Sequence, residues 1–315
     1  MADVNLGQTA TATLRNRSSD IADSVTDNSA LLSWMKSKGK IKTRTGGRTF
    51  VTPIFYAENG TAKFYDGGME SFSIVPETVI DASEWDRKFQ SGFISFTEAE
   101  RQSNRGEAAA LDLVEAKITN LKATLSNDFS TAMFGDGTTA KQIQGLQALV
   151  ADDPTAVSTV GGIAQGTYSW WRNQYKTDTT ASASNIEALI DGVWLSTIRG
   201  TDKPDLLIAG TNMFTFYKNA LGTNQRFMDW READTLNFEG LKYQSATMLF
   251  DPTCSTTRLY GLNTNDFELV CDPGRKWSAG DSRDIQNATY QVTPVLWSGA
   301  MTCRRRQSHF VIEGT

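Results

Sequence analysis

Residues 106–134 read GEAAALDLVEAKITNLKATLSNDFSTAMF, and this segment decides the architecture. Its apolar side chains recur at steps of three and four residues, at Leu111, Val114, Ile118, Leu121, Leu125, Phe129 and Ala132. This spacing predicts one amphipathic helix, ended by Gly135-Asp136-Gly137. The helix would span roughly 43 Å, whereas a compact chain of this length has a radius of gyration of about 20 Å. It is therefore predicted to be a strut along an extended molecule.

The segment before this helix, residues 48–75, has the composition of strands. RTFVTPIFY (48–56) and KFYDGGMESFSI (63–74) flank Asn59-Gly60, the strongest short signal for a hairpin turn, and Gly67-Gly68 makes a second break. Pro53 places the first strand at a sheet edge. A hairpin of this size lacks a core of its own. We therefore expect it to project and to contact a partner through Phe50, Ile54, Tyr56, Phe64 and Tyr65.

The segment after the helix alternates between helical and strand patterns. Residues 185–200 predict a helix, 205–210 a short buried strand, and the residues from Thr211 another helix with Thr211 as its N-cap. Strands are predicted within 240–252 and 256–264, and two or three more from residue 286 onward. This order predicts a mixed α/β domain around a central sheet.

The N-terminal segment is basic. Residues 24–35 predict a short amphipathic helix, and basic side chains follow at Lys36, Lys38, Lys40, Lys42, Arg44 and Arg48. Residues 1–48 hold eight basic and four acidic side chains, a net of +4, which leaves −9 for the rest of a chain whose total is −5. Such an arm is solvated, bridges to the acidic body of a neighbouring copy, or contacts nucleic acid.

Composition bounds the class of protein. The chain has 315 residues, of which 39% are hydrophobic and 21% charged, as in a globular protein of one large or two medium domains. No apolar run is long enough to predict a membrane span. The N-terminus lacks the apolar region of a signal peptide.

Residues suited to catalysis are scarce. His309 is the only histidine, and Cys254, Cys271 and Cys303 are widely spaced, which predicts buried free thiols and neither metal nor cofactor. Gly161 and Gly166 have P-loop spacing, but Thr167 stands where the chemistry requires lysine. The sequence therefore predicts no enzyme.

Two further motifs leave alternatives open. Trp170 and Trp171 could stack a nucleic-acid base, but a loop fixed by buried packing is favoured. Arg304-Arg305-Arg306 could meet phosphate, but a strand end that faces solvent or an acidic partner is favoured.

Three stretches carry a resemblance to a known family. They are RNRSSDIADSVTDNSALL near the start, GLQALVADDPTAVSTVGGIAQGTYSWWRNQ in the middle and PVLWSGAMTCRRRQ near the end. With the order of elements above, the chain resembles the major capsid proteins of tailed bacteriophages, which have the Hong Kong 97-type fold. The resemblance covers essentially the whole chain.

The resemblance implies an α+β fold with four parts. Residues 1–45 would be an N-terminal arm over neighbouring subunits, and 46–80 an extended hairpin loop over an adjacent subunit. Residues 81–140 and 286–315 would form a peripheral domain with a long spine helix. Residues 141–285 would form a mixed α/β axial domain.

The implied function is a coat protein that self-assembles into hexamers and pentamers of an icosahedral head around double-stranded DNA. The implied location is the virion, after synthesis in the host cytoplasm, with no membrane. Implied further partners are scaffolding, portal and decoration proteins and the packaged DNA; any scaffold would be a separate or removed chain. An encapsulin-like nanocompartment shell is the alternative, and a nucleic-acid-binding module a more remote one.

Overall fold

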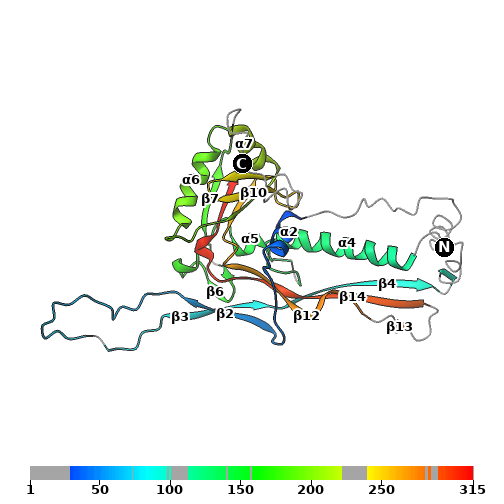
Figure 1. Ribbon diagram of the computed structural model, residues 1–315, viewed down its shortest axis with the longest axis horizontal. Helices are drawn as coiled ribbons and strands as arrows, with labels where there is room; N and C mark the ends of the chain where they lie inside the picture. Colours follow the sequence, from blue (N-terminus) through cyan, green and yellow to red (C-terminus); the bar gives the residue numbers. More distant parts are fainter. Residues whose placement is uncertain are drawn as a thin grey trace.

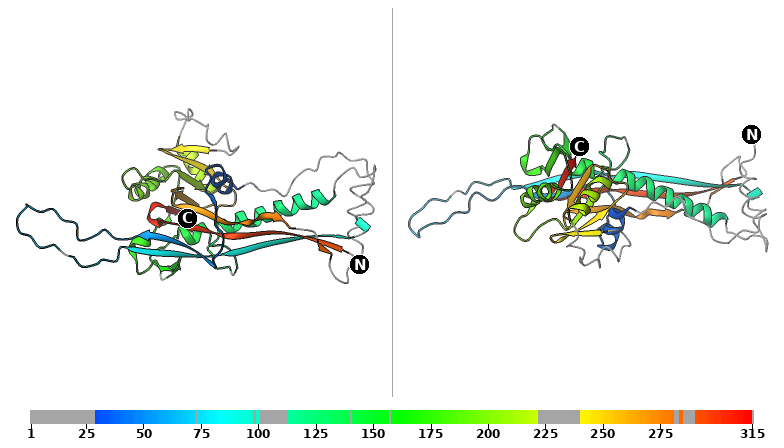
Figure 2. Two further views of the ribbon diagram at one scale, coloured as in Figure 1. Left: turned by 60° about the horizontal axis from the view of Figure 1, so that its bottom comes forward. Right: turned by 90° about the horizontal axis from the view of Figure 1, so that it is seen from above.

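The computed structural model describes residues 29–72, 74–97, 99–100, 113–139, 141–156, 158–221, 240–280, 283–284 and 290–314. Figure 1 shows an elongated molecule with a central body of strands and helices. A two-limbed loop extends from one end of the body, and a long helix runs beside long strands toward the other. The extended shape expected from residues 106–134 is seen in both further views (Figure 2).

A six-stranded sheet forms the core of the body. Its order is β7-β15-β11-β8-β10-β9. The strands are β7 (Gln174–Thr179), β15 (Phe310–Gly314), β11 (Arg258–Leu262), β8 (Leu206–Ala209), β10 (Ala246–Phe250) and β9 (Gly240–Tyr243). β8 is central and entirely buried, as its run of apolar residues predicts. The helices α6 (Ile186–Thr197) and α7 (Thr211–Ala220) join this core through Ile190, Trp194, Phe214 and Tyr217.

A second, elongated sheet runs beside the long helix α4 (Leu113–Met133) (Figure 1). Its strands are β1 (Ile41–Thr43), β12 (Phe267–Ala279), β14 (Tyr290–Cys303), β13 (Arg283–Asp284) and β4 (Lys88–Thr97). Gly92 of β4 lets α4 approach closely, because a Cβ there would lie 2.7 Å from Leu121. Leu125 and Phe129 of the predicted apolar stripe are buried and Ala132 is half-buried, so this part of the stripe faces the protein. The predicted helix is confirmed from residue 113 onward; residues 106–112 lie outside the described residues.

A two-stranded ribbon leads into the projecting loop. β2 (Thr49–Phe55) pairs antiparallel with β3 (Ile80–Asp86), from Thr49 opposite Asp86 to Phe55 opposite Ile80. Phe50, Ile54 and Trp85 on one face are buried in the core. Pro53 lies on this ribbon, where an edge position was predicted for it.

The hairpin turn predicted at Asn59-Gly60 is wrong. β2 pairs with 80–86, and residues 63–72 form no strand. The Gly60 N–H donates to Glu77 Oε2 at 2.7 Å, so the chain is still in one limb of the loop at this point. The turn lies instead near Gly67, whose φ of 81° is in the left-handed region that glycine adopts without strain.

The basic segment after residue 28 belongs to the body of its own chain. α2 (Ala30–Ser37) buries Leu31, Trp34 and Met35, and β1 pairs in parallel with Leu269–Cys271 of β12. The buried carboxylate of Asp251 accepts hydrogen bonds from Ser29 Oγ at 3.0 Å and Leu31 N at 3.2 Å, where the helix dipole favours an anion. Residues 29–45 are therefore not a solvated arm. The part of the arm at 1–28 lies outside the described residues.

Short elements connect these layers. They are α5 (Leu146–Leu149), β5 (Thr159–Val160), β6 (Ile163–Ala164) and the 3₁₀ turns η1 (Ser169–Trp171) and η3 (Arg306–Ser308). The N-cap of α7 is Gly210 rather than the predicted Thr211.

Two strands lie in a different sheet from the one their predicted domain implies. β15, expected with the peripheral residues 286–315, lies in the six-stranded sheet, and β12, expected in the axial range 141–285, pairs with β14. β15 pairs with β11 and β7 across long stretches of chain, which local sequence patterns do not encode. β12 and β14 are close in sequence, and the predicted boundary at residue 285 falls between these two paired strands.

Candidate functional site

The projecting loop, residues 56–79, is held as a two-limbed structure by hydrogen bonds. At its base Tyr56 N donates to Val79 O at 3.1 Å, and Tyr56 Oη donates to Thr78 O at 2.6 Å. Gly60 and Glu77 join the limbs farther out, as described above. The loop therefore has a defined shape without a β ladder.

Lys63 joins the two limbs near the tip. Its Nζ lies 3.1 Å from Glu70 Oε2, donates to Ser71 O at 2.9 Å, and lies 4.7 Å from the centre of the Phe72 ring. Tyr65 packs edge-on against the same ring at 5.4 Å. The contacts of Lys63 therefore hold the two limbs together at the base of residues 64–69, which we call the loop tip.

The loop exposes many large apolar side chains. Phe64 and Met69 are fully exposed, and Ile74 is 91% exposed. Tyr65, Phe72 and Val75 are exposed as well. Apolar surface of this extent usually marks an interaction site on a soluble protein.

The structure separates the five predicted contact residues of the hairpin. Phe64 and Tyr65 are exposed, as predicted. The prediction that Phe50 and Ile54 are exposed is wrong, because they alternate onto the inner face of β2 and pack in the core. Tyr56 is half-buried and stacks on Trp170 with ring centres 5.1 Å apart.

Other exposed apolar residues were missed by the sequence reasoning. Met69 and Ile74 were treated as parts of a returning strand, and Val75, Phe89 and Phe93 were not considered. Phe89 and Phe93 alternate with half-buried Gln90 and buried Ile94. Burial alternates with period two along residues 88–97, but the apolar residues of this stretch fall on both faces, so the sequence pattern does not mark Phe89 and Phe93 as exposed.

The four predicted lysines lie on a different part of the molecule from the loop. Lys36, Lys38 and Lys42 are exposed. Half-buried Lys40 donates to Asn265 Oδ1 at 3.1 Å, and Lys38 Nζ lies 4.7 Å from the centre of the Trp34 ring. They follow α2 and β1 along the body, so the structure does not bring them to the loop (Figure 1).

The tandem tryptophans fix a loop by packing, as predicted. Trp171 is buried, and its Nε1 donates to Val160 O at 2.8 Å. Trp170 lies between Tyr56 and Trp171, in contact with both rings. The nearby Gly161 has φ of 60°, and a Cβ there would lie 2.9 Å from Trp85. The glycines of this stretch therefore permit a tight chain path against buried tryptophans.

Arg306 occupies the centre of this packing. It was predicted to face solvent or an acidic partner, and this is wrong, because it is fully buried. Its Nε donates to Leu149 O at 2.7 Å, Nη1 to Gln165 Oε1 at 2.8 Å and to Trp171 O at 3.2 Å, and Nη2 to Asn173 Oδ1 at 3.1 Å. Burial lowers the pKa of Arg306 to about 10, so it is charged at neutral pH.

The other two arginines of the run meet carboxylates. Arg305 donates from Nε at 3.1 Å and from Nη2 at 2.8 Å to Asp266 Oδ2, and also contacts Asp202. Arg304 lies 3.3 Å from Glu268. The acidic-partner interpretation therefore holds for Arg304 and Arg305.

His309 is buried and has no access to a substrate. Its Nδ1 accepts from Asn263 N at 3.1 Å, so the neutral ring carries its proton on Nε2. Burial, with smaller contributions from Arg306 and Arg305, lowers the pKa of His309 to about 3. The side chain is therefore neutral in the folded protein near pH 7.

His309 should make the fold sensitive to acid. An exposed histidine has a pKa of about 6.5, so below pH 6.5 the unfolded chain binds a proton that the folded chain refuses. The contribution to stability is complete above pH 6.5 and falls by up to about 1.4 kcal/mol per pH unit until about pH 3. Denaturant unfolding of the wild type and His309→Gln from pH 7 to 4 measures this. As pH falls, we expect the free energy of unfolding to decrease more for the wild type than for His309→Gln. A difference between the two proteins that does not change with pH would contradict the lowered pKa of His309.

The other residues considered for catalysis are the three cysteines. All three cysteines are buried free thiols, as predicted, and burial raises their pKa. Among the described residues no group of three or more His, Cys, Asp or Glu could hold a metal ion. Within those same residues, no helix combines the length and apolarity needed to cross a membrane.

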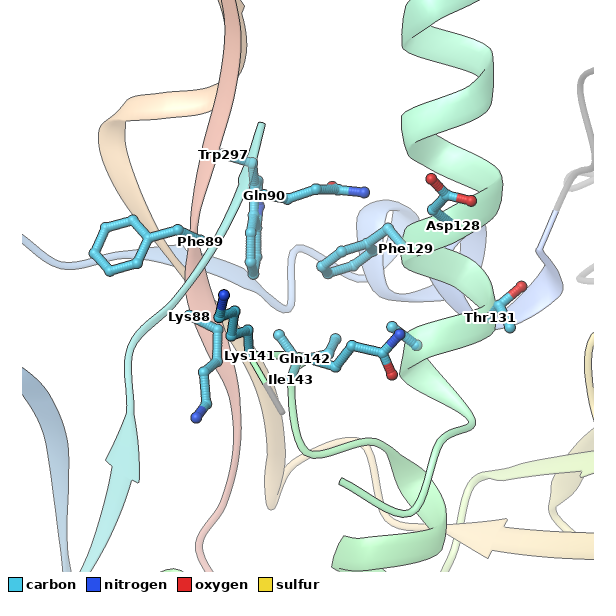
Figure 3. A pocket seen from close by; sticks show the side chains of 11 residues that line it. Lys88, Phe89, Gln90, Asp128, Phe129, Thr131, Lys141, Gln142, Ile143 and Trp297 are labelled. Carbon is cyan, nitrogen blue, oxygen red and sulfur yellow. The ribbon is translucent and has the colours of Figure 1, made fainter. Parts of the chain in front are cut away.

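A cleft of about 450 Å³ lies where the C-terminal end of α4 meets the start of β4 (Figure 3). Phe129 and Trp297 face each other there, with ring centres 4.7 Å apart. Lys88 and Lys141 contribute positive charge, and Asp128 of α4 contributes negative charge. The other lining residues are Phe89, Gln90, Thr131, Ala132, Gln142 and Ile143.

Solved capsid structures share this fold. The capsid asymmetric unit of cyanophage A-1(L) matches with a TM-score of 0.72 at 13% identity, over 95% of this chain and 96% of that chain. The capsid of Myoviridae phage XM1 matches with a TM-score of 0.58 at 12% identity, over 96% and 97%. The capsid of the empty GTA particle matches with a TM-score of 0.61 at 10% identity, over 94% and 95%.

No protein-family model and no curated protein matches the chain. At such low identity the structural likeness shows the fold alone. The predicted α+β fold of the Hong Kong 97 type is confirmed.

Proposed function

We propose that this chain is the major capsid protein of a tailed bacteriophage. It self-assembles into hexamers and pentamers of an icosahedral head that encloses double-stranded DNA. The fold shared with capsid chains supports this role, and the projecting loop is the observation that carries it. A loop that exposes Phe64, Met69 and Ile74 to water in an isolated chain is suited to contact a partner.

The contact is between copies of the same chain. An ordered loop loses little conformational entropy on binding, which favours association. The hydrogen bonds of Tyr56 and Gly60 and the ion pair of Lys63 supply this order. Each subunit of a shell presents the same loop, so a modest contact is repeated by the symmetry.

Assembly of the purified chain tests the proposal. The full-length protein is purified and imaged by negative-stain electron microscopy, alongside sedimentation. Closed particles tens of nanometres across are expected; a species that remains monomeric at all concentrations and salt conditions overturns the proposal. A nanocompartment shell would also form particles, and nuclease-protected genomic DNA in particles from infected cells separates the phage head from it.

Removing the positive charge of the basic segment should impair assembly. The variant replaces Lys36, Lys38, Lys40 and Lys42 with Gln. Residues 1–48 carry +4 against −9 for the rest of the chain, so copies can attract each other. Each exposed ion pair contributes at most about 1 kcal/mol, but a shell repeats it in every copy. We expect a lower yield of empty shells in the absence of DNA, measured by sedimentation as salt is varied.

Packaged DNA is the rival partner of these lysines. The control replaces three other exposed lysines, Lys122, Lys176 and Lys203, with Gln. Lys141 is left unchanged because it lines the cleft. If the Lys36–Lys42 variant forms empty shells with normal yield and salt tolerance and only retains less genome, the segment serves DNA and the assembly role is wrong.

A further inference from the structure

Asn59-Gly60 has no part in a hairpin turn, because the chain does not reverse at this pair. It is the only Asn-Gly pair in the sequence, and both residues are exposed to water. In such a pair the backbone nitrogen of glycine can attack the side-chain amide of asparagine, since no Cβ hinders the closure of a succinimide ring. The groups around the pair therefore decide whether this reaction is assisted.

The attacking nitrogen has a carboxylate at hydrogen-bond distance. Gly60 N donates to Glu77 Oε2 of the opposite limb at 2.7 Å. The backbone does not require glycine here, because the φ of Gly60 lies outside the left-handed region. A Cβ at this position would, however, lie 2.9 Å from Glu77 Oε1. Glycine therefore lets the carboxylate approach the N–H, where it can accept the proton as the nitrogen attacks.

The amide that is attacked has two hydrogen-bond donors on its oxygen. Asn59 Oδ1 accepts from Thr61 N at 3.0 Å and from Thr61 Oγ1 at 2.6 Å. A backbone N–H can only donate, so the atom of Asn59 that it contacts is the oxygen. This oxygen gains negative charge when the ring closes, and donors already directed at it stabilise that charge. The same contacts hold the Asn59 side chain in place, so less freedom is lost on ring closure.

We infer that the loop catalyses the conversion of its own Asn59 to aspartate and isoaspartate. Glu77 takes the proton from Gly60 N, and this nitrogen forms a bond to Cγ of Asn59. The bond from Cγ to Nδ2 then breaks, and ammonia leaves with the proton that Glu77 held. Water opens the succinimide at either of its two carbonyl groups, which gives aspartate or isoaspartate at position 59. Glu77 ends the reaction in its starting form.

The products change the loop at a contact between its limbs. A carboxylate replaces a neutral amide, so the net charge of residues 56–79 goes from −3 (four acidic side chains against Lys63) to −4. The new charge adjoins the N–H that binds Glu77, and isoaspartate also lengthens the backbone there by a methylene group. The hydrogen bond between Gly60 and Glu77 is therefore expected to weaken. The reaction involves a single chain, so it does not depend on the formation of a shell.

Glu77→Gln tests the role of the carboxylate. The glutamine oxygen can still accept from Gly60 N, but it takes up a proton far less readily. The full-length protein is incubated near neutral pH and digested with trypsin, and the aspartate and isoaspartate forms of the peptide 49–63 are separated and identified by mass spectrometry. We expect conversion to be at least about tenfold slower than in the wild type and to depend more steeply on pH, because hydroxide must then remove the proton. Thr61→Val, which removes one donor, should slow conversion to a smaller extent.

Glu58→Gln is the matched control, because it removes the same charge beside Asn59 and leaves Glu77 in place. It should convert at the rate of the wild type. Wild-type chains unfolded in denaturant should convert several-fold more slowly than folded ones, since Glu77 and Thr61 are no longer held at the pair. The inference is overturned if Glu77→Gln converts as fast as the wild type, if folded chains convert no faster than unfolded ones, or if aspartate forms without isoaspartate, because the succinimide yields both.

Discussion

Replacing Arg306 with Met is expected to lower the free energy of unfolding by about 3–5 kcal/mol. The substitution leaves Leu149 O, Trp171 O and Gln165 Oε1 without their buried donor. Asn173 Oδ1 keeps a partner, since it also accepts from Ala151 N at 3.0 Å. Each buried acceptor without a donor costs about 1–3 kcal/mol. Methionine carries no charge, so the variant avoids the free-energy cost of burying the guanidinium, and this offsets part of the loss.

Denaturant unfolding measures the loss. Arg275→Met, at an exposed position, is the control and should change stability by no more than about 0.5 kcal/mol. Arg306→Lys keeps the charge but lacks the planar fork of five donors, so its stability should lie between the wild type and Arg306→Met. Equal stability of Arg306→Met and Arg275→Met would contradict the role; if Arg306→Met does not fold, the comparison of Arg306→Lys with wild type decides.

The role of Arg306 could not be predicted from its neighbours in the sequence. Three consecutive arginines are normally a surface feature, because arginine is seldom fully buried without partners. Arg304 and Arg305 fit that expectation, whereas the partners of Arg306 lie 133 to 157 positions away. Only the folded chain brings the carbonyl groups of the 149–173 region around this guanidinium.

The fold could be predicted where a regular pattern extends over many residues. The spacing of apolar residues in α4 and α6 and the apolar run of β8 identify these elements, because burial on one face or on both imposes a period. Together with the family resemblance, these elements predict the α+β fold class.

The candidate site could be predicted only in part, because turn chemistry and pairing register are decided far along the chain. Asn59-Gly60 has the local signal of a turn, but Tyr56 and Gly60 bond to residues 77–79 and the limbs continue to Gly67. Because the chain turns near Gly67 and not at Asn59-Gly60, Phe50 and Ile54 of β2 lie against the core, and Met69 and Ile74 lie in the loop. The buried and exposed members of one aromatic-rich segment were therefore not distinguishable from composition.

Substituting the exposed apolar residues of the loop should abolish assembly while the subunit stays folded. The variant replaces Phe64, Met69 and Ile74 with Ser. All three side chains are almost fully exposed in the isolated chain, so the folded subunit loses little packing. Burial of each at an interface would contribute about 1.5–3 kcal/mol before the costs of association. Loss of all three removes enough free energy per contact to shift the assembly threshold by several orders of magnitude in concentration.

The control is a substitution in the ribbon that leads into the loop, and the opposite result is expected for it. Phe50→Ser places a hydroxyl in the core, where loss of a large side chain costs about 3–5 kcal/mol, so it should lower the unfolding midpoint of the subunit. The triple loop variant should unfold at the same denaturant concentration as the wild type and remain small in sedimentation and electron microscopy. Normal shells from the triple variant would show that these side chains do not form the contact. A triple variant that is as unstable as Phe50→Ser would show that the loop packs on its own subunit, because loss of stability on removing surface side chains requires that the folded chain buries them.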